Sequence, residues 1–79
     1  MTMTLKEKLN HAVKEYDRKQ YKKSLQSKRG YYNEYALGIY LGRVDDCCQV
    51  IEAGADIRKT LEDNFNDRLL DCVLKAAGL

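Results

Sequence analysis

The sequence contains no proline in 79 residues. At an average usage of about 5%, roughly four prolines would be expected in a chain of this length. Proline lacks a backbone N–H and clashes with the preceding helical turn, so it ends or kinks helices. Its absence, together with abundant lysine, leucine and alanine, favours long helices and predicts an all-α fold.

Capping residues indicate where the helices begin and end. Thr4 and Glu7 form the pattern of a capping box, in which each side chain satisfies a backbone N–H of the other residue. Asn33 and Asp56 are favourable N-cap residues for two further helices. Gly54 suits the left-handed position that follows a helix.

Apolar residues recur at spacings of three and four through these segments, as in helices with one buried face. The clearest stripe runs from Leu37 to Ile51. In the last segment, the apolar residues from Ile57 to Ala77 could form one continuous stripe, but residues 64–67 favour caps and turns, so we favour a break there. The sequence thus predicts one domain over residues 1–79, a compact three- to four-helix bundle with helices at about 5–27, 33–53, 57–63 and 67–77.

The first helix departs from its own pattern in its second half. Its apolar stripe is continuous from Leu5 to Tyr16, but Gln20 occupies the next expected position. Either the helix bends near residues 17–20, or its second half packs on something else. Gly30 is the expected terminator of this helix.

Charge is distributed unevenly along the chain. Residues 1–30 carry nine Lys/Arg and three Asp/Glu (+6), whereas residues 31–79 carry five Lys/Arg and nine Asp/Glu (−4), which sums to +2. Between residues 18 and 29 six Lys/Arg occur without an acid. The like charges in such a run repel one another, and segments of this kind often bind an anionic partner. The alternative is a solvated helix end.

Tyrosines lie within and directly after this basic run. Cations neutralise phosphates, and aromatic rings stack on bases. The alternative is that the tyrosine rings cover a thin core. The candidate partner-binding residues are Arg18, Lys19, Tyr21, Lys22, Lys23, Lys28, Arg29, Tyr31, Tyr32 and Tyr35.

Gly38 and Gly42 lie one turn apart inside a strongly predicted helix. Each costs about 1 kcal/mol there relative to alanine. Two small residues at this spacing let another backbone approach closely. That neighbour is either a helix of the same chain or a second molecule. Gly38 and Gly42 are therefore candidate self-association residues, and a homodimer is one expected assembly.

No pattern of catalytic or metal-binding residues occurs. Cys47 and Cys48 are adjacent, Cys72 is isolated and His11 is the one histidine, so zinc-ligand spacing is absent. A glycine-rich phosphate loop and an activated nucleophile are absent as well. We expect that the chain is not an enzyme and that it binds neither a cofactor nor a metal ion. The cysteines are interpreted as reduced core residues of a cytoplasmic protein that does not bind membranes.

The tracts YYNEYALGIYLGRVDD and DNFNDRLLDCVLKAAGL resemble, in size and composition, the small helical accessory proteins of bacteriophages and other mobile elements. That group includes anti-CRISPR proteins and other inhibitors of host defence. The resemblance covers residues 31–79 and implies a compact protein that blocks a larger host complex by occupying a surface. It assigns no functional residue.

These observations lead to one expected function and two alternatives. The first is a non-enzymatic protein-binding inhibitor or adaptor that occupies a surface of a host protein or nucleoprotein complex through the basic, tyrosine-rich segment. The second is a small regulator that binds nucleic acid directly. The third is a self-associating helical module.

Overall fold

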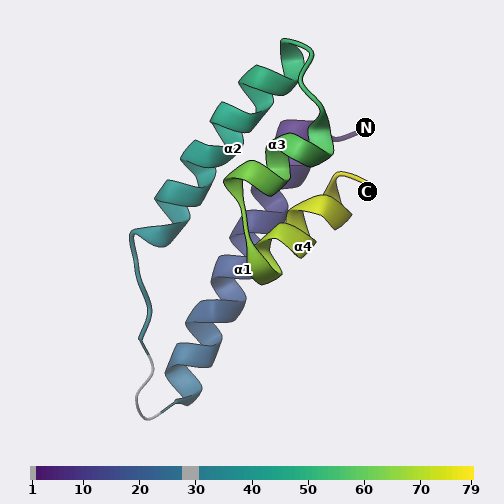
Figure 1. Cartoon of the computed structure of the whole chain (residues 1–79). Coiled ribbons are helices and arrows are strands. Elements are labelled where there is room, and N and C mark those ends of the chain that lie inside the picture. The colour runs from purple at the N-terminus through teal and green to yellow at the C-terminus, as the bar shows by residue number, and fades with distance from the viewer. Residues whose placement is uncertain (1, 28–30) are drawn as a thin grey trace.

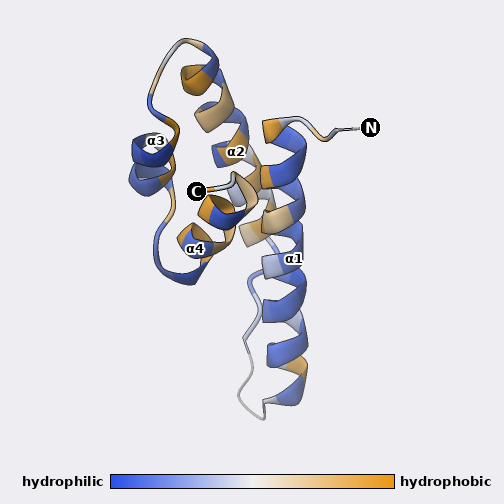
Figure 2. Ribbon diagram, turned by 90° about the vertical axis from the view of Figure 1, so that its right-hand side faces the viewer, coloured by the Kyte–Doolittle hydropathy of each residue, from blue (hydrophilic) through white to orange (hydrophobic). Residues whose placement is uncertain are grey.

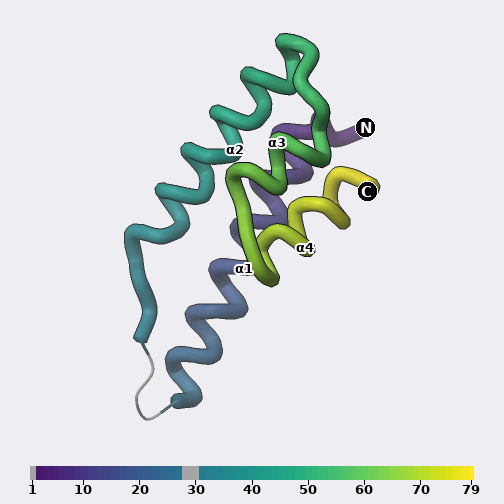
Figure 3. The backbone as a smooth tube through the Cα atoms, in the orientation of Figure 1, coloured from purple at the N-terminus to yellow at the C-terminus, as the bar shows by residue number. Residues whose placement is uncertain are grey.

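The computed structural model describes residues 2–27 and 31–79 and confirms the predicted all-α bundle. Its helices are α1 (Leu5–Gln26), α2 (Ala36–Glu52), α3 (Ile57–Asn64) and α4 (Asp67–Ala76). α1 packs against α2 and α4, and α3 packs against the same two helices (Figure 1). The tube in Figure 3 shows how the chain returns after α3 to place α4 beside α1. No helix in the described part of the chain combines the length and the apolar character needed to cross a membrane.

The predicted N-caps of α1 and α3 are present. The Thr4 hydroxyl accepts a hydrogen bond from the Glu7 backbone N–H and donates one to the Glu7 carboxylate, each at 3.2 Å. The Asp56 carboxylate accepts from the Lys59 backbone N–H at 2.8 Å. The bonds from the Glu7 and Lys59 N–H groups satisfy donors that lack an intrahelical partner, whereas the Glu7 carboxylate accepts from the Thr4 hydroxyl and not from the Thr4 N–H that a capping box predicts. Both helices therefore begin where the sequence predicts.

The predicted start of α2 at Asn33 is wrong by three residues. The Asn33 side-chain oxygen accepts from the Tyr35 N–H at 3.0 Å, and its carbonyl accepts from the Ala36 N–H at 3.1 Å. An asparagine side chain competes for nearby backbone donors and so favours a turn over a helix. The helix begins at Ala36, with Tyr35 at the N-cap position and no side-chain cap hydrogen bond.

The ends of α2 and α3 agree with the sequence. Gly54 follows α2 with a φ of +107°, which lies in the left-handed region that glycine tolerates. The predicted break in the last segment falls at Phe65 and Asn66, both in extended backbone. Phe65 is buried at the break. The interruption thus brings an aromatic ring into the core while the chain turns into α4.

The core is small, and all four helices contribute to it. Figure 2 shows apolar residues on the faces that the helices turn toward one another. Burial of these side chains is the dominant favourable term in folding, and a chain of this length has little of it. The buried apolar residues are Leu9, Val13, Val44, Cys47, Cys48, Leu61, Phe65, Leu69 and Val73.

The second half of α1 projects beyond α3 and α4, and the molecule measures 45 × 28 × 20 Å (Figures 1 and 2). α1 is one uninterrupted helix of 22 residues that ends at Gln26. The predicted terminator Gly30 lies outside the described residues. The projecting half lies beside the connection that leads to α2. Tyr32 contacts Asp17 and Tyr21 of this half, which agrees with the expected alternative that it packs on something other than the rest of the bundle.

Shortening Leu61 to alanine should strongly destabilise the fold, because its side chain is 0% exposed and its removal leaves a cavity. We expect Leu61→Ala to lower the free energy of unfolding by about 2–5 kcal/mol, measured by urea unfolding and circular dichroism. Leu25→Ala is the matched control, since Leu25 is 68% exposed, and its effect should stay within about 0.5 kcal/mol. Equal losses in the two variants would contradict this description of the core.

Candidate functional site

A buried carboxylate ties the projecting half of α1 to the connection between α1 and α2. Asp17 continues the apolar face of α1 and is 8% exposed. The Tyr32 hydroxyl donates a hydrogen bond to Asp17 Oδ2 at 2.5 Å. This hydrogen bond raises the pKa of Tyr32 above its ordinary value of 10.0, because the bond exists only while the phenol keeps its proton. The contact also provides a partner for an acid that would be costly to bury alone.

Aromatic rings extend this contact. The rings of Tyr21 and Tyr32 meet edge to face, with centroids 5.1 Å apart. Tyr16 of α1 and Tyr40 of α2 form a second edge-to-face pair at 6.4 Å. Such pairs add to the stabilisation that comes from burial alone. Of the predicted partner-binding tyrosines, Tyr32 is therefore half-buried and engaged within the chain.

Among the described residues, the cations of the projecting half make no ion pair with an acid of the chain. In residues 2–27 and 31–79, the ion pairs join Lys6 to Asp45 at 2.9 Å and His11 to Glu15 at 3.2 Å. Neither pair involves the projecting half of α1. Its described cations are all exposed and have no carboxylate at ion-pair distance among those residues: Arg18, Lys19, Lys22 and Lys23.

These cations and the exposed tyrosines near them form what we term the basic–tyrosine surface. Tyr31 and Tyr35 are 84% and 73% exposed, and Tyr21 is exposed to about half of its area. Lys28 and Arg29, which the sequence assigns to the same segment, lie outside the described residues. The basic–tyrosine surface comprises Arg18, Lys19, Tyr21, Lys22, Lys23, Tyr31 and Tyr35. It offers cations and aromatic rings to carboxylates, phosphates or bases.

Tyr16 lies where three depressions of the surface meet. One of about 190 Å³ is lined by Asp17 and Tyr32. Another, of about 800 Å³, contains Lys23 and Asp67, which lie beyond ion-pair distance of each other. The third has a volume of about 500 Å³ and runs between α1 and α4. Burial raises the pKa of Tyr16 above its ordinary value.

Gly38 and Gly42 face open space. A Cβ atom placed on either glycine would meet no atom within 4 Å, and both residues are exposed. The expectation that they allow close packing against another helix of the same chain is therefore wrong within the described residues. Ile39 and Val50 of α2 are exposed as well. Self-association through this helix stays a prediction.

The cysteines differ in their surroundings. Cys47 and Cys48 are buried as predicted, and burial raises the pKa of both thiols, which keeps them protonated and unreactive. Cys72 is only partly buried, so its interpretation as a core residue is too strong. Among the residues that the structure describes, no group of three or more His, Cys, Asp or Glu side chains could hold a metal ion.

Asp17 is the site residue that sequence analysis did not assign. Its signal was an acid four residues after Val13, at a core-facing position of the helix, where a charged side chain needs a partner. The partner, Tyr32, lies fifteen residues further along the chain. Their contact forms only because the chain reverses between α1 and α2.

Comparisons with protein-family models, with curated proteins and with solved structures found no match to this chain. Candidate functional residues are therefore those that the chain's own chemistry and exposure single out. The most distinctive set is the basic–tyrosine surface, because its cations lack carboxylate partners among the described residues and Tyr31 and Tyr35 are largely exposed.

Removing the Tyr32 hydroxyl should destabilise the protein in a pH-dependent way. Because folding raises the pKa of Tyr32, its hydrogen bond contributes fully below about pH 10 and is lost as pH rises through the raised value. We expect Tyr32→Phe to be less stable than the wild type at pH 7, and the difference to shrink above pH 10. Urea unfolding across this range measures it. Tyr31→Phe, which changes an exposed neighbour, is the control and should match the wild type at pH 7.

Alanine at position 42 should stabilise α2. Glycine in a helix interior is less favourable than alanine by about 0.5–1 kcal/mol, and the added Cβ meets no neighbour. Gly42→Ala should raise the free energy of unfolding by that amount in urea titrations. The same change at Gly54 should lower it, because alanine is strained at a φ of +107°. Destabilisation by Gly42→Ala would reveal a close contact on this face.

Proposed function

We propose that this chain is a non-enzymatic protein-binding inhibitor or adaptor of phage or mobile-element type. Its basic–tyrosine surface occupies an acidic surface, or a groove next to nucleic acid, on a host nucleoprotein complex. The observation that carries the proposal is that, within the described residues, the cations of the projecting half of α1 have no carboxylate at ion-pair distance. The resemblance of residues 31–79 to small inhibitors of host defence supports the same role.

Repulsion among these cations supports an anionic partner. Arg18 and Lys22 are four residues apart on α1, and so are Lys19 and Lys23. Like charges at this spacing destabilise a helix by about 0.2–0.5 kcal/mol per pair. An anionic partner removes that repulsion and adds attraction, so binding and the order of this helix half reinforce each other.

The exposed tyrosines supply contact area to the same interaction. A tyrosine ring covers a large surface with only two side-chain torsions, so it loses little conformational entropy on binding. Tyrosine and arginine are also enriched among the residues that contribute most to protein interfaces. Tyr31 and Tyr35 are largely exposed, and Arg18 is exposed on the projecting half of α1.

Direct binding of nucleic acid is the second candidate, because the same cations and rings suit phosphates and bases. The two functions differ in their salt dependence and in their ligand. A labelled DNA duplex or single strand should be retarded in a gel at low salt only if nucleic acid is the ligand. Retention should then fall steeply as salt rises, with a slope that counts phosphate contacts.

Charge reversal tests the proposed surface. We expect Lys22→Glu combined with Lys23→Glu to lose the partner complex that the wild type captures from a bacterial host lysate, as measured by quantitative mass spectrometry. The control is Arg58→Glu combined with Lys59→Glu, an equal charge change on exposed residues of α3, which should retain the complex. Far-UV circular dichroism should be the same for all three proteins.

Two results would contradict the proposal. If the charge-reversed protein captured the same complex as the wild type, the basic–tyrosine surface would not be the contact. If the wild type retarded DNA and Lys22→Glu with Lys23→Glu abolished the shift, while no protein complex was captured, the chain would be a nucleic-acid-binding protein.

A further inference from the structure

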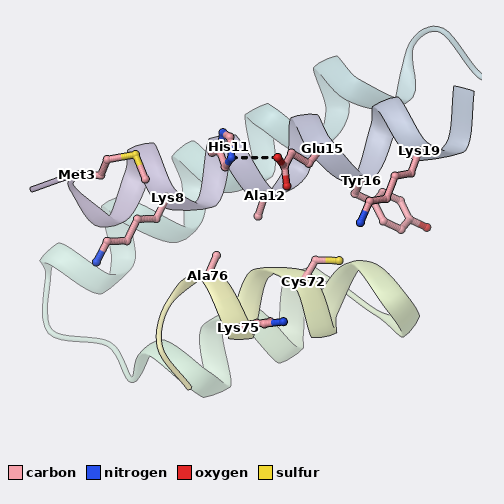
Figure 4. A pocket seen from close by; sticks show the side chains of 10 residues that line it. All are labelled: Met3, Lys8, His11, Ala12, Glu15, Tyr16, Lys19, Cys72, Lys75 and Ala76. Carbon is pink, nitrogen blue, oxygen red and sulfur yellow. Dashed lines mark ion pairs between the residues drawn. The ribbon is translucent and has the colours of Figure 1, made fainter. Parts of the chain in front are cut away.

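The cleft between α1 and α4 forms a second surface that the proposed function does not use. Its volume is about 500 Å³, and it is partly open to solvent (Figure 4). Residues from the first two thirds of α1 line one side, and residues from the last part of α4 line the other. It shares only Lys19 with the basic–tyrosine surface.

The floor of this cleft is apolar and built from small side chains. Ala12 of α1 faces Cys72 and Ala76 of α4 across the cleft, with Met3 at one end and Tyr16 at the other (Figure 4). Apolar atoms make up most of the lining. Helices pack with axes about 8–10 Å apart, and small residues at the contact favour the shorter distances. A further helix can therefore lie in the cleft close to both α1 and α4.

Cations stand on both rims of the cleft. Lys8 and Lys19 extend from α1, and Lys75 from α4. Glu15 is the one carboxylate among the lining residues, and His11 engages it at 3.2 Å. The three lysines thus have no carboxylate at ion-pair distance within residues 2–27 and 31–79. An apolar floor between cationic rims is complementary to a ligand that has an apolar face flanked by acidic groups.

We propose that this cleft binds an acidic amphipathic helix of a partner protein. The apolar stripe of that helix lies on Ala12 and Ala76, and its carboxylates meet the lysines on the two rims. Lys8 and Lys19 are eleven residues apart, which is about 16 Å along a helix, so an occupant of three to four turns reaches both. Recognition of this kind reads apolar residues at spacings of three, four and seven.

The shape of the cleft favours a helix over a small amphiphile. Small-molecule sites enclose most of their ligand's surface, whereas this cleft is partly open and runs from Met3, just before α1, along the helix to Lys19. Its cations are also spread along its length and over both rims instead of gathering at one end, where a single anionic head group would need them. The inference does not rest on the proposed function, since Lys22 and Lys23 lie outside the cleft.

A designed peptide tests the inference directly. The probe is a fluorescein-labelled peptide of about four helical turns, with leucine at every third or fourth position and glutamate on the flanking positions. Fluorescence anisotropy should show saturable binding to the full chain. Lys8→Glu combined with Lys75→Glu should weaken binding at least about tenfold, because two charge contacts become repulsive. Lys22→Glu combined with Lys23→Glu should bind like the wild type, as should Arg58→Glu combined with Lys59→Glu.

Cys72 provides an independent readout on the floor of the cleft. The bound peptide should slow alkylation of Cys72 by iodoacetamide and leave the buried Cys47 and Cys48 unaffected, as followed by mass spectrometry. A peptide of the same composition with its leucines spread around the helix should neither bind nor protect. The inference is wrong if both peptides bind equally, if Lys8→Glu with Lys75→Glu binds like the wild type, or if dodecanoate protects Cys72 and the peptide does not.

Discussion

The hydrogen bond between Tyr32 and Asp17 determines which residues lie against the projecting half of α1 and which stay exposed beside it. That half carries few apolar residues, so it has little core to bury against the connection. The bond holds Tyr32 against α1, where the Tyr21 and Tyr32 rings meet with centroids 5.1 Å apart. Tyr31 then lies in the depression next to Asp17 and stays largely exposed. A structural contact inside the chain thus sets the place where the basic–tyrosine surface begins.

The rest of the fold divides the molecule into two kinds of surface. The first half of α1 contributes Leu9 and Val13 to the core and packs on both α2 and α4. Its remaining face opens into the cleft beside α4, where an apolar floor lies between lysines. The second half of α1 has no such floor and presents its cations to solvent. Lys19 stands at the boundary and belongs to both surfaces.

Features that depend on contacts between residues close in sequence were predictable. Features that depend on contacts between residues far apart in sequence were not. The Thr4 and Asp56 caps and the turn at Gly54 use contacts within a few residues, so the sequence alone located them. The predicted start of α2 was wrong because the Asn33 side chain can either cap a helix or stabilise a turn. In the structure it stabilises a turn. The candidate cations were predictable, but their lack of partners among the described residues was not.

The cleft was beyond sequence analysis for the same reason. Its floor combines Ala12 with Cys72 and Ala76, which are about sixty residues apart. Alanines on a helix are compatible with burial, with a solvated face or with a groove, and nothing local distinguishes these outcomes. The burial of Asp17 was similarly hidden, because the tyrosine that satisfies it lies in another segment.

The elongated shape also changes what the small net charge means. Electrostatic interactions between exposed groups fade over about 8 Å at physiological ionic strength, while the long axis of the molecule is 45 Å. A partner at the free end of α1 is therefore screened from the acids beside the turn between α2 and α3, which lies at the opposite end (Figure 1). It meets the cations of the projecting half, with Asp67 and Asp71 beside Lys23 as the nearby acids, even though the chain as a whole carries only +2. The net charge and the isoelectric point of the whole chain consequently understate how strongly the free end of α1 attracts anions.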